Sequence, residues 1–151
     1  MTVVTVEHST APGVLDLVRQ GDEFGLSLYP PESYYALDAS ELDRDDVELH
    51  VARHDGHAIG IAALVDAGDD TGELKRMFVD PTARGRGAAR ALLDSIETAA
   101  RARGIRVLRL ETGPKQPEAI ALYTSHGYEP IDAFGPYVGD PSSLCFAKSL
   151  S

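Results

Sequence analysis

The sequence has a single cysteine, Cys145, among its 151 residues. One cysteine excludes an intramolecular disulfide and a metal site built from several thiolates. No stretch approaches the roughly 20 apolar residues that are needed to span a bilayer, and the first ten residues contain Glu7 and lack the apolar core of a signal peptide. We therefore expect one soluble domain over residues 1–151, in the reducing environment of the cytoplasm, with Cys145 as a buried core thiol.

Basic residues are also scarce, with 14 lysines and arginines against 24 acidic residues, and they are unevenly placed. Residues 1–73 hold three of them beside 16 acidic residues, whereas residues 74–151 hold 11 beside eight. The net charge of −10 disfavours a nucleic-acid partner. The basic second half suits a small anionic ligand. The acidic first half suits a cationic or amine ligand, or serves only to keep the protein in solution.

Hydrophobic periodicity and turn signals predict an α/β or α+β domain with a mixed sheet. The expected order is β-α-α-β-β-β-α-β-α-β-β. Strands are predicted at residues 3–6, 47–54, 57–65, 74–79, 106–111, 128–131 and 143–148. Helices are predicted from Pro12 to the stop at Pro30-Pro31, and over residues 32–42, 87–103 and 117–126.

A turn rich in glycine and arginine joins a predicted strand to a long predicted helix. It reads Val79-Asp-Pro-Thr-Ala-Arg84-Gly85-Arg86-Gly87-Ala88-Ala89-Arg90. The start of a helix presents unpaired backbone N–H groups and the positive end of the helix dipole. Gly85 and Gly87 allow a phosphate to approach the backbone, and the arginines add charge-assisted contacts. The pattern therefore predicts a pyrophosphate site at the start of this helix.

Two other interpretations of the turn compete. One is a solvated helix start without a ligand, although cations there would oppose the helix dipole. The other is the dinucleotide pattern G-x-G-x-x-G, because Gly85-x-Gly87 precedes a helix and Glu111 ends the next strand, where a ribose-binding carboxylate would lie. Against it, Arg90 occupies the third glycine position and five residues separate Val79 from Gly85. A P-loop is excluded, since no Gly-Lys-Ser/Thr follows.

Several motifs in residues 73–131 together resemble the GNAT N-acetyltransferase superfamily. The run Arg84-x-x-Gly87-x-Ala89 is similar to its R/Q-x-x-G-x-G/A motif, and Ala119-Ile-Ala-Leu-Tyr123-Thr-Ser-His-Gly127-Tyr128 resembles its A-x-x-L-Y-x-x-x-G-F/Y helix. The resemblance implies a mixed, mostly antiparallel central sheet of about seven strands flanked by about four helices. It also implies an N-acetyltransferase that uses acetyl-CoA and passes the acetyl group directly to a primary amine. No metal site is expected, because His50 and His54 have the spacing of one helix face but lie in a strand pattern.

The resemblance assigns acetyl-CoA to this strand and turn. The strand backbone would bind the pantetheine amides as an added strand would, and the N–H groups of residues 85–90 would hold the pyrophosphate. Gln116 stands where family members often have Asn. The implied cofactor-binding residues are Met77, Phe78, Val79, Arg84, Gly85, Arg86, Gly87, Ala88, Ala89, Arg90 and Gln116.

Acetyl transfer requires that the amine lose a proton and that the departing thiolate gain one. The resemblance implies that Tyr123 donates the second proton, although by itself this tyrosine would better suit a packed helix face. Glu73 or Glu111, at the ends of neighbouring strands, could accept the amine proton directly or through water, or could be a salt-bridged carboxylate. Strand alternation predicts that Glu73 shares a face with Lys75, Met77 and Val79. The two carboxylates stay open as alternatives.

Substrate contacts are expected near the first two helices, where Leu28, Tyr29 and Tyr34 cluster, unless these side chains only pack the helices together. The loop Phe134-Gly-Pro-Tyr137 is a second candidate wall. We expect a small-molecule acceptor such as an amino acid or polyamine, with a protein amine as the alternative, no nucleic-acid or membrane partner, and a possible homodimer. A catalytically silent acyl-CoA-binding or regulatory module is the competing interpretation.

Overall fold

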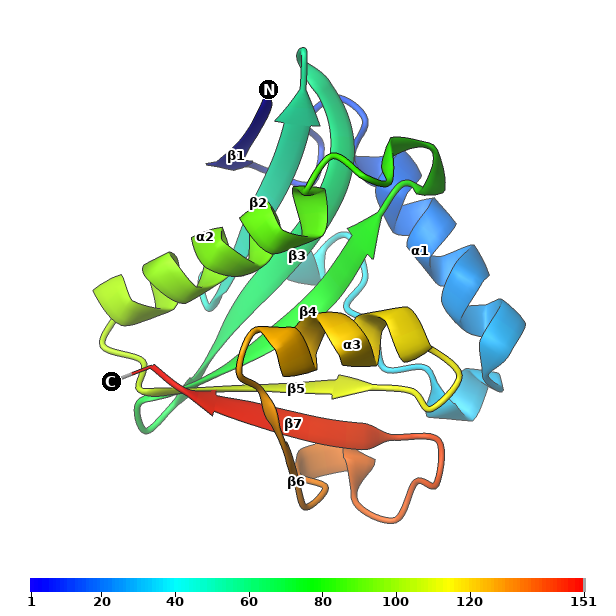
Figure 1. Ribbon diagram of the computed structural model, residues 1–151, viewed down its shortest axis with the longest axis vertical. Coiled ribbons are helices and arrows are strands. Elements are labelled where there is room, and N and C mark those ends of the chain that lie inside the picture. The colour runs from blue at the N-terminus through cyan, green and yellow to red at the C-terminus, as the bar shows by residue number, and fades with distance from the viewer. Residues whose placement is uncertain (151) are drawn as a thin grey trace.

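The computed structural model describes residues 1–150, which are organised around one sheet of seven strands in the order β1-β2-β3-β4-β5-β7-β6 (Figure 1). The strands are β1 (Thr2–Val6), β2 (Val47–His54), β3 (His57–Gly68), β4 (Thr71–Val79), β5 (Val107–Thr112), β6 (Glu129–Ile131) and β7 (Leu144–Ser149). Neighbouring strands are antiparallel except β4 and β5, which are parallel. The expected mixed, mostly antiparallel sheet is therefore confirmed.

Three α-helices cover the two faces of the sheet: α1 (Val14–Leu28), α2 (Ala88–Ala102) and α3 (Pro117–Ser125). The buried residues of α1 pack with Ile61 and Ala63 of β3 on one face. On the other face α2 and α3 pack with Ala62 and Leu64, since successive strand residues point to opposite sides. Cys145 is buried, as expected. No helix within residues 1–150 is long and apolar enough to cross a membrane.

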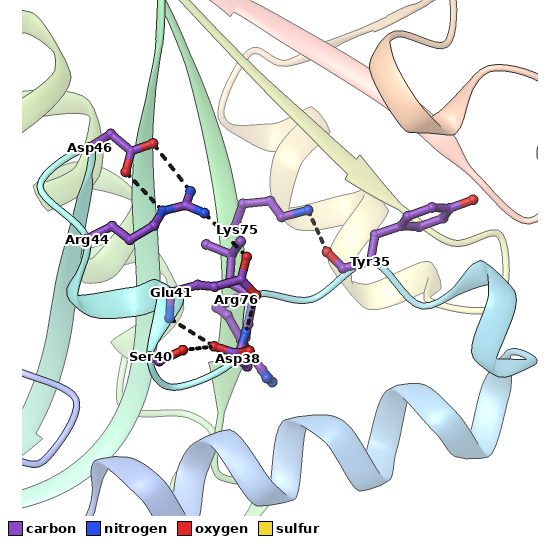
Figure 2. A network of polar contacts seen from close by, with 9 residues as sticks. Tyr35, Asp38, Ser40, Glu41, Arg44, Asp46, Lys75 and Arg76 are labelled. Atoms are coloured by element: carbon purple, nitrogen blue, oxygen red, sulfur yellow. Dashed lines mark hydrogen bonds and ion pairs between the residues drawn. The ribbon is translucent and has the colours of Figure 1, made fainter.

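The helix expected over residues 32–42 is wrong. Two short 3-10 helices form instead, at Pro31–Ser33 and Glu41–Asp43, and residues 34–38 between them are not helical. Side chains of β4 take the carbonyl groups that an α-helix would use. Lys75 Nζ donates to the Tyr35 carbonyl at 2.6 Å (Figure 2), and Arg76 Nε donates to the Leu37 carbonyl at 2.8 Å. The segment thus satisfies its backbone on the sheet rather than within a helix.

A β-bulge in β4 divides the sheet. Ile61 pairs with Phe78 and Ala63 pairs with Lys75, so Arg76 and Met77 together oppose one residue of β3. Arg76 has a φ of 57°, in the left-handed region that non-glycine residues rarely adopt. Strand β4 pairs with β5 only over residues 71–74, and beyond the bulge the two strands diverge (Figure 1).

The bulge also reverses the side-chain alternation of β4, so the predicted face is wrong. Leu74, Met77 and Val79 pack with the core under α2, whereas Phe78 packs with the core under α1. Glu73 and Lys75 alternate with Leu74 and therefore lie on the face opposite to Met77 and Val79. A strict period of two cannot anticipate this change, because one extra residue inverts every position after it.

Candidate active site

The divergence of β4 and β5 opens a cleft with two adjoining parts. The wide part has a volume of about 570 Å³ and lies between the end of β4, the start of α2 and the start of α3. The narrow part, of about 190 Å³, lies between β4, the end of β5 and the segment that follows α1. Met77, Phe78 and Gln116 are among the residues that line both parts, so the two are continuous.

The wide part collects nearly all the predicted cofactor residues. Ten of them line it, namely Met77, Phe78, Val79, Arg84, Gly85, Gly87, Ala88, Ala89, Arg90 and Gln116. Arg86 is exposed and does not line either part, and its carbonyl accepts a long hydrogen bond, of 3.4 Å, from the Thr2 hydroxyl. The structure therefore gathers residues from β4, the following turn and α3 around one space.

The turn that leads into α2 is open on its glycine side. Gly85 and Gly87 have φ values of 84° and 73°, and a Cβ built on either would meet no atom within 4 Å. Gly87 is the N-cap of α2, no side chain of residues 1–150 caps this helix, and its first turn holds no acidic residue. The first N–H groups of the helix and the positive end of its dipole are thus available to an anion, which is what a pyrophosphate requires.

Arg84 lies at the mouth of the wide part. It is 60% exposed, and its guanidinium is 3.1 Å from the carboxylate of Glu118, which is 77% exposed. Exposed ion pairs of this kind contribute little to stability. Arg84 can therefore exchange Glu118 for a phosphate without a large energetic cost.

Tyr123 lines the narrow part, with 5% of its surface exposed. Its ring packs edge-on against that of Tyr128, with 5.9 Å between the ring centroids. Within residues 1–150 its hydroxyl makes no hydrogen bond. Burial, and then the charge of Glu111, raise the pKa of Tyr123 well above that of a free phenol. The phenol is therefore protonated at neutral pH, with its donor unused.

The two candidate carboxylates have different surroundings. Glu111 lines the narrow part, where one of its oxygens accepts a hydrogen bond from Ser143 Oγ at 2.8 Å. Burial raises the pKa of Glu111, against the opposing effect of the Ser143 bond. Glu73 does not line the cleft. It accepts a hydrogen bond from the Tyr137 hydroxyl and lies 3.7 Å from Lys75 Nζ.

Of the three predicted substrate residues, Tyr29 and Tyr34 line the narrow part and Leu28 does not. The Tyr29 hydroxyl accepts a hydrogen bond from the Lys115 N–H at 3.0 Å, which joins the end of α1 to the loop after β5. Gly113 leaves the space for this ring, because a Cβ there would collide with it. The Tyr34 hydroxyl donates to Asp22 at 2.6 Å. Leu28 contributes a carbonyl that accepts a hydrogen bond from Lys115 Nζ.

Lys75 and Arg76 also line the narrow part, and neither is among the site residues predicted from the sequence. Arg76 is 4% exposed and forms an ion pair with Asp22 of α1 at 2.8 Å. The available signal was the placement of two consecutive basic residues within an otherwise apolar strand. In a regular strand one of the two must face a core, so the pair indicates a bulge or a polar cavity.

The comparison with known proteins identifies the family. Residues 15–128 match the Acetyltransferase (GNAT) family. The chain is 44% identical over 145 residues to the IAA acetyltransferase of Azospirillum brasilense. The matched stretch covers 95% of each protein.

Solved structures agree with this assignment. A Klebsiella pneumoniae protein that is provisionally described as an acyl-CoA N-acyltransferase has a TM-score of 0.87 and 36% identity, with 100% of this chain and 99% of that chain covered. The PaiA N-acetyltransferase of Thermoplasma acidophilum, solved in complex with coenzyme A, shares the fold with a TM-score of 0.75 and 16% identity over 99% of each chain. The chain therefore belongs to the acetyltransferase (GNAT) family and is an acetyl-CoA-dependent N-acetyltransferase.

Proposed function

We propose that this enzyme passes the acetyl group of acetyl-CoA directly to a primary amine of a small molecule, within a ternary complex. One observation carries the proposal. A single continuous cleft is lined at one end by the open start of α2 and at the other by Tyr123 and Glu111. An anion site and an acid–base pair joined in this way suit a phosphorylated acyl carrier and an acceptor that meet between β4 and β5.

The wide part would bind the carrier. The backbone N–H groups from Gly85 to Arg90 are suited to the pyrophosphate, with Arg84 and Arg90 as charged neighbours. Within residues 1–150, the pairing of β4 with β5 ends at Leu74, so the β4 backbone beyond it is not paired with that strand. Its amide groups can therefore bond to the pantetheine arm as an added strand would. The thioester would then lie where the wide and narrow parts join.

The narrow part would carry out the proton transfers. An alkyl ammonium, with a pKa near about 10.4, must first lose a proton, and we assign its acceptance to Glu111. The amine nitrogen then attacks the thioester carbon, and a β4 N–H stabilises the oxyanion. When the carbon–sulfur bond breaks, Tyr123 donates its proton to the thiolate, and the second proton that the nitrogen loses as the amide forms restores the phenol. Glu73 is the weaker candidate for the base, since its carboxylate already accepts a hydrogen bond from Tyr137 and lies beside the Lys75 ammonium.

The relative from Azospirillum brasilense supplies a second candidate acceptor, because it is named for IAA. The test measures free CoA thiol released by the purified enzyme from acetyl-CoA, with a panel of small primary amines, with IAA, and with a lysine-containing peptide. The proposal predicts stimulation by small amines above the rate without acceptor. Stimulation only by the peptide or only by IAA would contradict it, and tight acetyl-CoA binding without stimulation by any acceptor would favour a silent binding module.

A further inference from the structure

Three charged side chains line the narrow part of the cleft, namely Lys75, Arg76 and Glu111. The protein itself satisfies them to very different degrees. This difference bears on which charges an acceptor can carry, because a charge that is removed from water needs a partner.

The Lys75 ammonium is fully engaged. It donates to the Tyr35 carbonyl at 2.6 Å and to the Tyr137 hydroxyl at 2.7 Å, and Glu73 lies 3.7 Å away. Figure 2 shows the side chain extended towards the Tyr35 carbonyl. Because an ammonium has three donors, little capacity is left for a ligand. Its side chain is only 14% exposed.

The Arg76 guanidinium is engaged at each of its nitrogens. Nε donates to the Leu37 carbonyl, Nη1 lies 3.3 Å from both the Val18 carbonyl and the Tyr34 hydroxyl, and Nη2 pairs with Asp22 at 2.8 Å. These bonds hold α1 and the segment after it against the bulge. A ligand anion could recruit Arg76 only by breaking them.

Glu111 is the exception. Its partner is the neutral Ser143 hydroxyl, and no ion pair reaches its carboxylate within residues 1–150. Aromatic rings of Phe24, Tyr29 and Tyr35 line the same space. A carboxylate and aromatic residues that line one cavity form an environment that binds a cation, through an ion pair and through cation–π contacts.

We infer that the acceptor is an alkyl or arylalkyl amine that carries no carboxylate, rather than an α-amino acid. The inference rests on the proposed function and narrows its substrate class. An ammonium would pair with Glu111. A carboxylate on the same substrate would lie near Glu111, and could pair with the two cations that line this space, Lys75 and Arg76, only by displacing their internal bonds.

The experiment compares acceptors that differ only in the carboxylate: tyramine with tyrosine, and cadaverine with lysine. Tyrosine amide is added because it keeps the bulk of tyrosine without its charge. We expect kcat/KM for each amine to exceed that for its amino acid by at least about tenfold, which corresponds to about 1.4 kcal/mol, and the amide to behave like the amine.

Two variants add a readout besides turnover. Calorimetry in the presence of CoA should show that Glu111→Gln binds tyramine about tenfold or more weakly and no longer distinguishes it from tyrosine. Glu129→Gln, an exposed glutamate on β6, should retain both properties.

Each contrary result has a distinct meaning. Equal or faster transfer to the amino acids, or an amide as poor as tyrosine, would overturn the inference and leave amine acetylation in place. Transfer to IAA in preference to the amines would also overturn it. If no acceptor in the set is acetylated, the proposed function fails and the inference fails with it.

Discussion

At the scale of single residues, two tyrosines whose rings touch use their hydroxyls differently. Tyr128 donates to the buried carboxylate of Glu97 at 2.9 Å, in a group that also contains Lys148. The Tyr123 ring packs against that of Tyr128, but its hydroxyl has no hydrogen-bond partner within residues 1–150. The first hydroxyl therefore contributes to stability, and the second is left available to a ligand.

Replacing Tyr123 by Phe should lower kcat by about 100-fold or more, because the departing thiolate loses its proton donor. The acetyl-CoA Kd and the unfolding free energy should change little, since no internal hydrogen bond is lost. Tyr128→Phe is the matched control. It should cost about 1.5–3 kcal/mol of stability, as expected for a lost bond to a charged group, and should retain kcat. An unchanged kcat in Tyr123→Phe would reject the acid role.

The pH profile tests Glu111. A base must be deprotonated, and burial raises the pKa of this carboxyl, so kcat/KM should increase with pH through a value above the ordinary pKa of glutamate. Glu73→Gln should preserve this acidic limb. If the residual activity of Glu111→Gln still shows the acidic limb, the limb belongs to another group.

The raised pKa of Glu111 also makes the stability of the protein depend on pH. The folded state binds the Glu111 proton more tightly than the unfolded state, so the contribution of this group to stability falls as pH rises through the raised pKa. Glu111→Gln removes the loss of stability that ionisation of the buried carboxyl causes. Thermal unfolding at pH 7 should therefore show a variant that is less active but at least as stable, and a marked loss of Tm would contradict this account.

At the scale of elements, the bulge in β4 places the site. It turns Lys75 and Arg76 towards the segment after α1, and it ends the pairing with β5 at Leu74. The bonds made by Arg76 to the Leu37 and Val18 carbonyls and to Asp22 then fix α1 over the cleft. The strained φ of Arg76 persists because these contacts compensate for it.

Arg76→Met should therefore lower the unfolding free energy by about 2–4 kcal/mol, because the apolar side chain loses the hydrogen bonds to the Leu37 and Val18 carbonyls and leaves Asp22 without its cationic partner. Chemical denaturation measures this loss. Arg19 is an exposed arginine of α1 whose ion pairs lie within that helix. Arg19→Met should therefore have little effect on the unfolding free energy. Similar small effects for both variants would show that Arg76 does not hold α1 in place.

The start of α2 offers a second test at this scale. Gly87→Glu places bulk and negative charge where the pyrophosphate is expected, and should weaken acetyl-CoA binding by at least about tenfold in calorimetry. Gly104→Glu is the matched control at the other end of α2. Gly104 has a φ of 77°, and a Cβ built on it would meet no atom within 4 Å. Both variants should lose about 1–2 kcal/mol from backbone strain. Retained affinity in Gly87→Glu would reject the phosphate site.

At the scale of the whole molecule, the parts that sequence predicted are those fixed by local pattern. Hydrophobic periodicity and turn signals located the strands, α1 and α2, because both are local properties of the sequence. The helix expected over residues 32–42 failed because the backbone bonds there go to Lys75 and Arg76, some 40 positions away. The helix propensity of residues 32–42 does not depend on those distant partners, so it could not reveal them.

The same division holds for the site. The glycines of the α2 start were predictable, since a backbone open to phosphate needs residues without side chains. The different surroundings of Glu73 and Glu111 were not. They depend on Tyr137 and Ser143, which the segment before β7, distant in sequence, brings to each carboxylate.

A crystal structure of the enzyme with bound CoA tests the central claim most directly. The account predicts that the diphosphate lies against the N–H groups of residues 85–90 and that the CoA sulfur lies within hydrogen-bond reach of the Tyr123 hydroxyl. A nucleotide bound away from the start of α2, or a sulfur on the side of the cleft remote from Tyr123, would contradict it.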